Sequence, residues 1–262
     1  PLVRAAHPVP SLAVTVLVVV LAVGAGMSAG RIVVLALAVL TGQLSVGWAN
    51  DVLDVERDRQ AGRQDKPVAL GEVRASVVAA AAGVAVLLCV PLSLALGLRP
   101  GLAHLVAVGA AWAYDLGLKS TVWSPLPYAL AFGLAPAVVW WAVPATPPWW
   151  IVVAGALLGI GAHGTNALPD LRDDELTGVR GLPQRLGARR TRILTAASLG
   201  LSVLVLAVAP SGPVGPAGWV SLVAAALLIA AGLVRPRLAF PTTLAVAGVA
   251  VVLLAVRGGG VG

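Results

Sequence analysis

Charged residues are scarce in this chain, and that scarcity sets its class. Only 11% of the 262 residues are Asp, Glu, Lys or Arg, whereas soluble domains carry about 25%. The sequence also has one cysteine, three histidines and 5% aromatic residues. A lone cysteine, Cys89, cannot form an internal disulfide, and without a His or Cys cluster nothing indicates a zinc site. These absences exclude a separate soluble domain, a disulfide framework and a zinc protein.

Long apolar runs fill most of the chain instead. Hydrophobic residues make up 59% of it, and about 20 consecutive apolar residues are enough to span a bilayer. The runs are continuous rather than alternating at period two, which excludes a β-barrel. We therefore predict an all-α integral membrane protein, with one polytopic domain over residues 1–262. The nine predicted transmembrane helices lie at 9–27, 31–49, 73–96, 99–118, 125–143, 148–168, 191–210, 217–234 and 238–256.

Basic residues are distributed unevenly about these spans. With the N-terminus inside, 15 of the 18 Lys and Arg residues fall in cytoplasmic segments, and only Arg31, Arg99 and Arg257 fall outside. Such an excess on cytoplasmic loops is the orientation signal of membrane proteins. We predict a multi-pass protein of the cell membrane whose N-terminus and 2–3 and 6–7 loops are cytoplasmic. The net charge of +7 then reflects topology, and nucleic-acid binding is not expected.

Acidic residues gather in two loops that have the pattern of a duplication. Ten of the eleven Asp and Glu residues lie in the 2–3 and 6–7 loops, and Asp115 is the exception. Residues 50–71 and 166–187, aligned without gaps, match at seven of 22 positions. Internal repeats in membrane proteins often place a site at their interface, so we expect both loops to cap one central cavity. The identical pairs are Asn50/Asn166, Asp54/Asp170, Asp58/Asp174, Gly62/Gly178, Pro67/Pro183, Leu70/Leu186 and Gly71/Gly187.

The acid spacing within each loop has a chemical meaning. Asp51, Asp54 and Asp58 are three and four residues apart, and Asp170 and Asp174 are four apart, which places each set on one helix face. Like charges at this spacing repel one another, so a bound cation is expected. Oxygen ligands select hard ions such as Mg²⁺, which combines a few carboxylates with substrate phosphates. The motifs thus predict two Mg²⁺ ions holding a phosphate or diphosphate. The alternative is that both loops carry ordinary solvated charges.

Further polar residues stand beside the motifs. Guanidinium and ammonium groups bind phosphates, although each of these could equally be a topology charge. Polar residues within a span are functional hypotheses by default, although a histidine there could equally form a helix–helix hydrogen bond. The candidate substrate contacts are Arg63, Lys66, Lys119, Arg180, Arg185, His163 and Asn166.

These features resemble the UbiA superfamily of intramembrane prenyltransferases, and the similarity extends over essentially the whole chain. The family motif NDxxDxxxD is met by Asn50, Asp51, Asp54 and Asp58, and its DxxxD by Asp170 and Asp174. The stretch YDLGLKSTVWSPLPYALAFGLAP at 114–136 is similar to the family segment that links spans four and five. The resemblance implies a nine-helix bundle around a cavity that opens sideways to lipid.

The resemblance also implies a reaction and a set of roles. Two Mg²⁺ ions would hold the diphosphate of a polyprenyl donor, whose C1–O bond breaks to give an allylic carbocation. A small lipophilic or aromatic acceptor then attacks the cation. The catalytic carboxylates would be Asp54, Asp58, Asp170 and Asp174, joined as metal ligands by Asn50 and Asp51. Arg63, Lys66 and Lys119 would contact the diphosphate, and Tyr114 would lie near the reacting carbon.

Two departures from the family pattern leave the acceptor class open. Ser120 stands where members that prenylate quinone-type aromatics often have arginine, and the start of the first span lacks a common lysine. Isoprenoid length and oligomeric state also stay open. The principal alternative is a UbiA-type membrane terpene cyclase, which quenches the cation within its own chain. A transporter is disfavoured because the acids lie at one membrane face. A CDP-alcohol phosphotransferase is disfavoured because its DGxxAR signature is absent.

Overall fold

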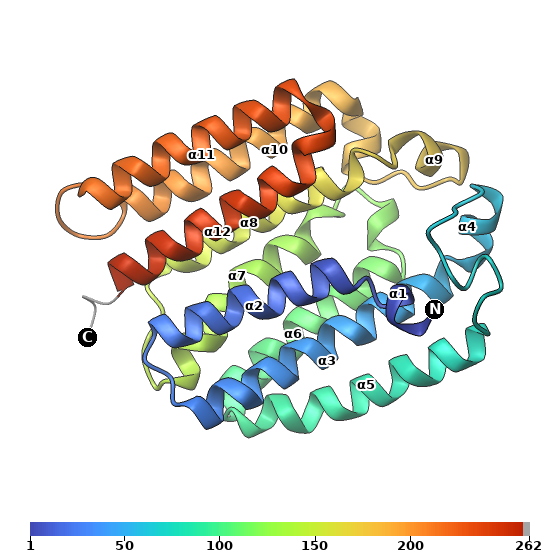
Figure 1. Ribbon diagram of the computed structural model, residues 1–262, viewed down its shortest axis with the longest axis horizontal. Helices are drawn as coiled ribbons and strands as arrows, with labels where there is room; N and C mark the ends of the chain where they lie inside the picture. The colour runs from blue at the N-terminus through green and yellow to red at the C-terminus, as the bar shows by residue number, and fades with distance from the viewer. Residues whose placement is uncertain (259–262) are drawn as a thin grey trace.

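The computed structural model describes residues 1–258, and every regular element within them is helical (Figure 1). Side chains of residues 255, 257 and 258, and so that of Arg257, lie outside the described part. Five elements are short: α1 (Leu2–Ala5), α4 (Val55–Gln60), α9 (Leu171–Leu176) and the 3₁₀ helices η1 (Leu118–Ser120) and η2 (Pro236–Leu238). The long helices in this range are α2 (Pro8–Gly24), α3 (Ala29–Leu53), α5 (Ala75–Ala95), α6 (Leu98–Asp115), α7 (Pro125–Ala142), α8 (Trp149–Ala167), α10 (Leu182–Val208), α11 (Pro216–Val234) and α12 (Ala239–Gly258).

Seven helical segments among the described residues are long and apolar enough to cross a bilayer. They comprise α3, α5, α7, α8, α10, α11 and residues 236–254. The remaining two long helices differ: α2 is apolar but only 17 residues long, and α6 carries Arg99, His104 and Asp115. The predicted all-α, multi-pass class is confirmed, whereas the count of nine spans stays a prediction.

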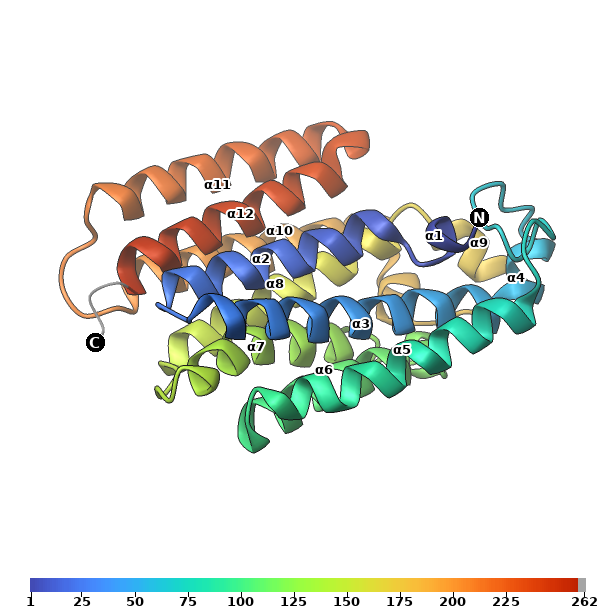
Figure 2. The ribbon, with the colours of Figure 1, turned by 60° about the horizontal axis from the view of Figure 1, so that its bottom comes forward.

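Most of the long helices surround the interior of the bundle, whereas α5 and α11 lie on its outside. Helix α5 packs on the outside of α3 and α6, and α11 packs on the outside of α10 and α12 (Figures 1 and 2). Contacts between α12 and α2 bring the two ends of the chain's helical path together. Large apolar side chains such as Leu87 on α5 and Leu227 on α11 are exposed, as expected of surfaces that face lipid.

Glycines bring α7 and α8 into backbone contact. A Cβ atom at Gly155 would lie 2.4 Å from the carbonyl oxygen of Phe132, and one at Gly159 would lie 2.3 Å from that of Tyr128. Small residues permit this close approach between membrane helices. The approach matters for the interior because α7 carries Tyr128 and Phe132, which line it. Larger side chains at these glycines would separate the two helices.

Both motif loops lie at one end of the bundle. Figure 1 shows α4 and α9 beside each other, at the end where the N-terminus also lies. Each short helix follows a long one along the chain, α4 after α3 and α9 after α8. The loops predicted to cap the bundle are therefore on the same face of the molecule.

Candidate active site

The two motif loops share a backbone conformation as well as a sequence pattern. Asp54, between α3 and α4, has φ −93° and ψ 2°, and Asp170, at the start of α9, has φ −95° and ψ 0°. Positive φ angles occur at the aligned glycines Gly62 (64°) and Gly178 (82°). A second aligned pair, Gly71 and Gly187, has φ 75° in both loops. Only glycine adopts such angles at little cost, so the shared glycines specify one loop shape twice.

A cavity of about 440 Å³ lies between the loops. It is lined by the ends of α3 and α8, by α4 and α9, and by parts of α2, α6, α7 and α12. The predicted site residues that line it are Asn50, Asp54, Asp58, Arg63, Lys66, Tyr114, Lys119, Asn166, Asp170 and Asp174. The fold thus brings ten of the fourteen predicted site residues, from both halves of the chain, to one cavity.

A smaller apolar pocket of about 130 Å³ extends this cavity into the bundle. The two spaces share walls, including Leu17 on α2, Val46 on α3 and Phe132 on α7. Deeper in the bundle the walls come from Leu21 and Leu254. The combined space has a polar, charged end at the loops and an apolar end between the helices.

Cations neutralise Asp54 in the first motif. Lys119 Nζ lies 2.6 and 2.7 Å from the two carboxylate oxygens of Asp54, and Arg57 pairs with the same group. Asn50 donates from Nδ2 to Asp54 and to Asp115, both at 2.9 Å. Asp54 and Lys119 are both buried. Because removing one member of a buried ion pair leaves an uncompensated charge, this arrangement ties α3 to the segment after α6.

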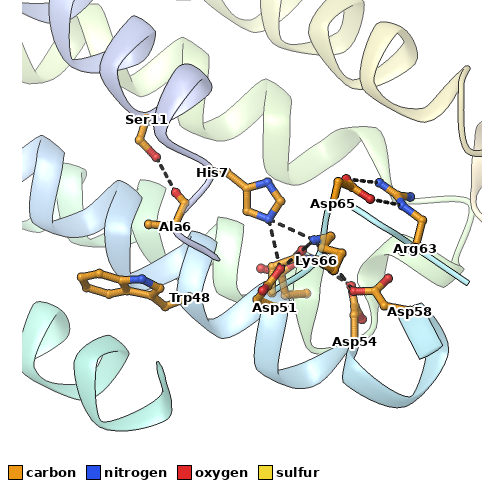
Figure 3. Close-up of polar contacts among 12 residues, drawn as sticks. Ala6, His7, Ser11, Trp48, Asp51, Asp54, Asp58, Arg63, Asp65 and Lys66 are labelled. Carbon is orange, nitrogen blue, oxygen red and sulfur yellow. Dashed lines mark hydrogen bonds and ion pairs between the residues drawn. The ribbon is translucent and has the colours of Figure 1, made fainter. Parts of the chain in front are cut away.

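Lys66 organises a second cluster behind the first. Its Nζ lies 3.0 Å from Asp51 Oδ1 and from His7 Nε2 (Figure 3). The same Nζ lies 3.0 Å from Asn50 Oδ1. Asp51 has no exposed surface and does not line the cavity. The structure therefore places this predicted metal ligand in an internal ion pair. His7, which was not among the sequence candidates, is a cavity residue.

The second motif is more open. Helix α9 contains no buried residue, and Asp170 is paired with Arg63 of the first loop at 3.0 Å. Arg63 also forms two hydrogen bonds to Asp65, at 2.9 and 3.0 Å, which lower the pKa of Asp65 to about 2. Asp174 accepts a hydrogen bond from Gln184 at 2.7 Å. Arg63 is thus a bridge between the two loops.

Burial acts on the last carboxylate of each motif. Desolvation raises the pKa of Asp58 despite the opposing charge of Lys66, 3.9 Å away. Desolvation also raises the pKa of Asp174, against the hydrogen bond from Gln184. One Asp58 oxygen is buried without a hydrogen-bond partner. Such groups favour a cation that would replace the lost solvation.

Two tyrosine rings form part of the cavity wall. Tyr114 and Tyr128 meet edge to face with centroids 5.3 Å apart, and Asn166 donates to the Tyr128 hydroxyl at 3.3 Å. His163 contacts both tyrosine rings but does not line the cavity. Its Nε2 lies 3.1 Å from the Ser124 hydroxyl. His163 therefore supports the tyrosines in this structure, and its predicted substrate contact stays a prediction.

Arg180 and Arg185 are exposed and do not line the cavity, so the structure does not bring them to the other candidates. Residues absent from the sequence-based set do line it: His7, Arg57, Asp115 and Tyr128. Arg57 lies within the first motif, and Asp115 was visible as the one acid outside the loops. His7 and Tyr128 carried no comparable signal.

The oxygen donors suit a hard divalent cation. Five of them line the cavity at or near its charged end: Asn50, Asp54, Asp58, Asp170 and Asp174. No three carboxylate, histidine or cysteine side chains among the described residues stand close enough together to form a metal site. Lys119, Arg57 and Arg63 instead pair with the motif carboxylates. The donor chemistry fits Mg²⁺, and binding requires these cations to give up their partners.

Fold and site together define a membrane enzyme with a charged pocket for an anionic head group and an apolar pocket for a tail. The family model described as the UbiA prenyltransferase family matches residues 11–241. The chain therefore belongs to the UbiA prenyltransferase family, and its class is that of a prenyltransferase. Among curated proteins, none matches the chain.

Solved structures share this fold. A UbiA homolog from Archaeoglobus fulgidus, bound to GPP and Mg²⁺, superposes with a TM-score of 0.74 at 19% identity, covering 96% of this chain and 97% of that one. An apo UbiA homolog from Aeropyrum pernix K1 gives 0.73 at 19% identity, covering 94% and 97%. A structure described for digeranylgeranylglyceryl phosphate synthase gives 0.69 at 14% identity, covering 98% and 96%.

Proposed function

We propose that this protein moves an isoprenyl group from a polyprenyl diphosphate to a small lipophilic or aromatic acceptor, in a Mg²⁺-dependent reaction. The observation that supports it most strongly is the single cavity lined by both aspartate motifs and continued by an apolar pocket. A diphosphate matches the charged end, and a hydrocarbon tail matches the apolar end. The A. fulgidus homologue has been solved with GPP and with DMAPP, each with Mg²⁺.

The metal-binding residues in this proposal are Asn50, Asp54 and Asp58 of the first loop and Asp170 and Asp174 of the second. Asp51 supports them through Lys66. We propose two Mg²⁺ ions, one for each loop. When bound, Mg²⁺ supplies neutralisation of the diphosphate as it leaves.

The cationic side chains have a second role once the carboxylates bind metal. Lys119, Arg57 and Arg63 then become free to contact the diphosphate oxygens, and Lys66 stands behind Asn50 and Asp58. These charges favour departure of the diphosphate, so the C1–O bond breaks and leaves an allylic carbocation. Positive groups aimed at developing negative charge are the largest contribution to many enzymatic rate enhancements.

Aromatic side chains protect the carbocation in this proposal. Tyr114, Tyr128 and Phe132 line the cavity next to its charged end, and aromatic faces stabilise cations. His163 and Asn166 hold the two tyrosines in position. The apolar walls beyond them exclude water, so the acceptor reaches C1 first. We also propose nine spans, with the motif loops and N-terminus in the cytoplasm, on the distribution of Lys and Arg.

Diphosphate release tests the proposal directly. Purified protein in detergent is incubated with geranyl, farnesyl or geranylgeranyl diphosphate, with Mg²⁺ or EDTA, and with or without aromatic acceptors, and products are examined by mass spectrometry. We expect release that requires Mg²⁺ and an acceptor and is lost in Asp54→Ala. Release without acceptor, giving a cyclic hydrocarbon or alcohol, would identify a cyclase instead. An absence of release with every donor and acceptor would contradict the proposal.

A further inference from the structure

One uncharged polar side chain stands in the wall between the charged cavity and the apolar pocket. Gln43, on α3, lines both spaces. Seven other residues also line both, and all of them are apolar: Val14, Leu17, Val46, Ala111, Ala131, Phe132 and Leu158. The amide is therefore the one polar group at this junction in the described part of the chain.

Gln43 also differs from the other polar side chains nearby because it has no hydrogen bond to any described residue. Thr41 and Ser45, on the same helix, donate to backbone carbonyls of Leu37 and Gly42 at 2.7 Å. In the deeper pocket, Ser202 donates to Ala154 and His104 Nδ1 lies 2.8 Å from Ser93. Polar residues in membrane helices are expensive and functional by default. An unpaired amide facing a cavity indicates a ligand with a matching polar group.

The position of Gln43 limits which ligand that is. It precedes Asn50 by seven residues on the same helix, which is about 10 Å along the axis. The tail of a prenyl diphosphate is hydrocarbon and offers no hydrogen bond at that depth. An amide buried against such a tail loses its hydrogen bonds to water and gains none in exchange, which costs free energy. A second molecule that reaches C1 from the interior, however, would bring its far end close to Gln43.

The placement of the basic side chains further restricts the chemical class of the ligand that Gln43 could bind. The Lys and Arg side chains that line either space are Arg57, Arg63, Lys66 and Lys119, and all of them line the charged cavity only. A carboxylate or phosphate at the depth of Gln43 would be buried without a cation, which is costly. A side-chain amide both donates and accepts hydrogen bonds, so it matches a hydroxyl or a carbonyl.

We propose that Gln43 binds a neutral oxygen substituent, a hydroxyl or carbonyl, of the prenyl acceptor. This proposal rests on the prenyl transfer proposed above. Gln43 then determines acceptor specificity: it orients the molecule so that its electron-rich face meets C1, while the donor is held by the motif residues. Acceptors of the phenol, quinol or alcohol class fit, and acceptors whose interior end is a free acid do not.

Binding of three related probes tests the proposal without catalysis. The probes are 2-naphthol, naphthalene and 2-naphthoate, which share one ring system and differ in the polar group. Affinity is measured by calorimetry on the full chain in detergent, with and without Mg²⁺ and unreactive geranyl S-thiolodiphosphate. The variants are Gln43→Leu and, as a matched control, Thr41→Val, which removes a polar group of α3 that lines neither space. Comparison between variants cancels partitioning of the probes into detergent.

We expect wild type and Thr41→Val to bind 2-naphthol about 10-fold more tightly than naphthalene, and Gln43→Leu to lose that preference. Affinity for the thiolodiphosphate is expected to change less than about 2-fold in Gln43→Leu. The proposal is overturned if wild type shows no preference or prefers 2-naphthoate, or if Gln43→Leu retains the preference. Equal loss of thiolodiphosphate affinity would make Gln43 structural and would overturn it as well.

The catalytic assay separates this proposal from the one on which it rests. A naphthol preference that depends on Gln43, together with no diphosphate release by wild type, would sink the transferase proposal and leave the binding site standing. Transfer to 2-naphthol with an unchanged KM in Gln43→Leu would sink the Gln43 proposal alone. An alcohol formed from the donor without acceptor, and lost in Gln43→Leu, would assign the amide to a water molecule and overturn its role in acceptor binding.

Discussion

The two motif loops have the same backbone and different surroundings. Asp54 and Asp170 have nearly identical φ and ψ, yet Asp54 is buried between Lys119 and Arg57, whereas α9, which follows Asp170, has no buried residue. The first loop is thus held by its own half of the chain. The second is joined to the first through Arg63. We interpret the first loop as the fixed wall of the site and the second as the wall that adjusts to the diphosphate.

Neutralising the aligned carboxylates Asp54 and Asp170 should give the largest effects and show most clearly how the two loops differ. We expect Asp54→Asn and Asp170→Asn each to reduce diphosphate release by at least about 100-fold, since both lose a charge at the donor's head group. Only Asp54→Asn should also destabilise the protein, by on the order of 3 kcal/mol, because it removes the nearer of the two carboxylate partners of the buried Lys119 and leaves only Asp115, 3.9 Å away. Release assays and thermal unfolding in detergent measure the two effects. Equal destabilisation by both variants would contradict the comparison.

Breaking the bridge between the loops should have the next largest effect. Arg63→Gln removes the ion pair with Asp170 and a cation of the cavity, so we expect KM for the donor to rise about 10-fold. The matched control is Arg59→Gln, whose guanidinium is exposed and lies outside the cavity. Steady-state kinetics over a range of donor concentrations provide the measurement. An unchanged KM in Arg63→Gln would show that the second loop positions itself without the bridge.

The aligned glycines test whether the shared backbone has the same energetic cost in both loops. Gly62 and Gly178 have positive φ angles and open space where a Cβ would lie. Alanine at either position should therefore destabilise the protein through backbone strain alone, by about 1 kcal/mol. Thermal unfolding of Gly62→Ala and Gly178→Ala checks the expectation. A clear difference between the destabilisation by Gly62→Ala and that by Gly178→Ala would contradict an equal backbone strain in the two loops.

Substitution of Asp65 should have the smallest effect on the free energy of unfolding. The pKa of Asp65 is lowered to about 2 by the hydrogen bonds from Arg63, so its stabilising contribution is present above the unfolded pKa and is lost as pH falls through about 2. The side chain is 62% exposed, and solvent screening limits the contribution to below about 1 kcal/mol. Asp65→Asn is therefore expected to lower stability slightly at pH 7. Unfolding curves at pH 7 and pH 3 should differ from wild type less at the lower pH, and a larger difference at pH 3 would contradict the assignment.

The site could be predicted from the sequence to the extent that its signals were local. The duplicated carboxylates, the shared glycines and the apolar helices are all visible within short windows. The duplication predicted their assembly at one cavity, and residues of both motifs line a single cavity in the structure. The internal position of Asp51 and the supporting position of His163 could not be read from spacing, because each depends on which neighbour fills the space beside it.

Sequence alone determined the helices and the loop shapes. Transfer of an apolar run into a bilayer depends on the residues of that run, and a positive φ angle depends on the glycine that adopts it. Tertiary structure decided the pairings: Lys119 with Asp54, Arg63 with Asp170 across 107 residues, and His7 with Lys66 across 59. It also decided that Gln43, an inconspicuous residue of an apolar run, has an amide with no hydrogen-bond partner among the described residues. These outcomes depend on how closely helices such as α7 and α8 approach, which is set by packing between segments far apart in the chain.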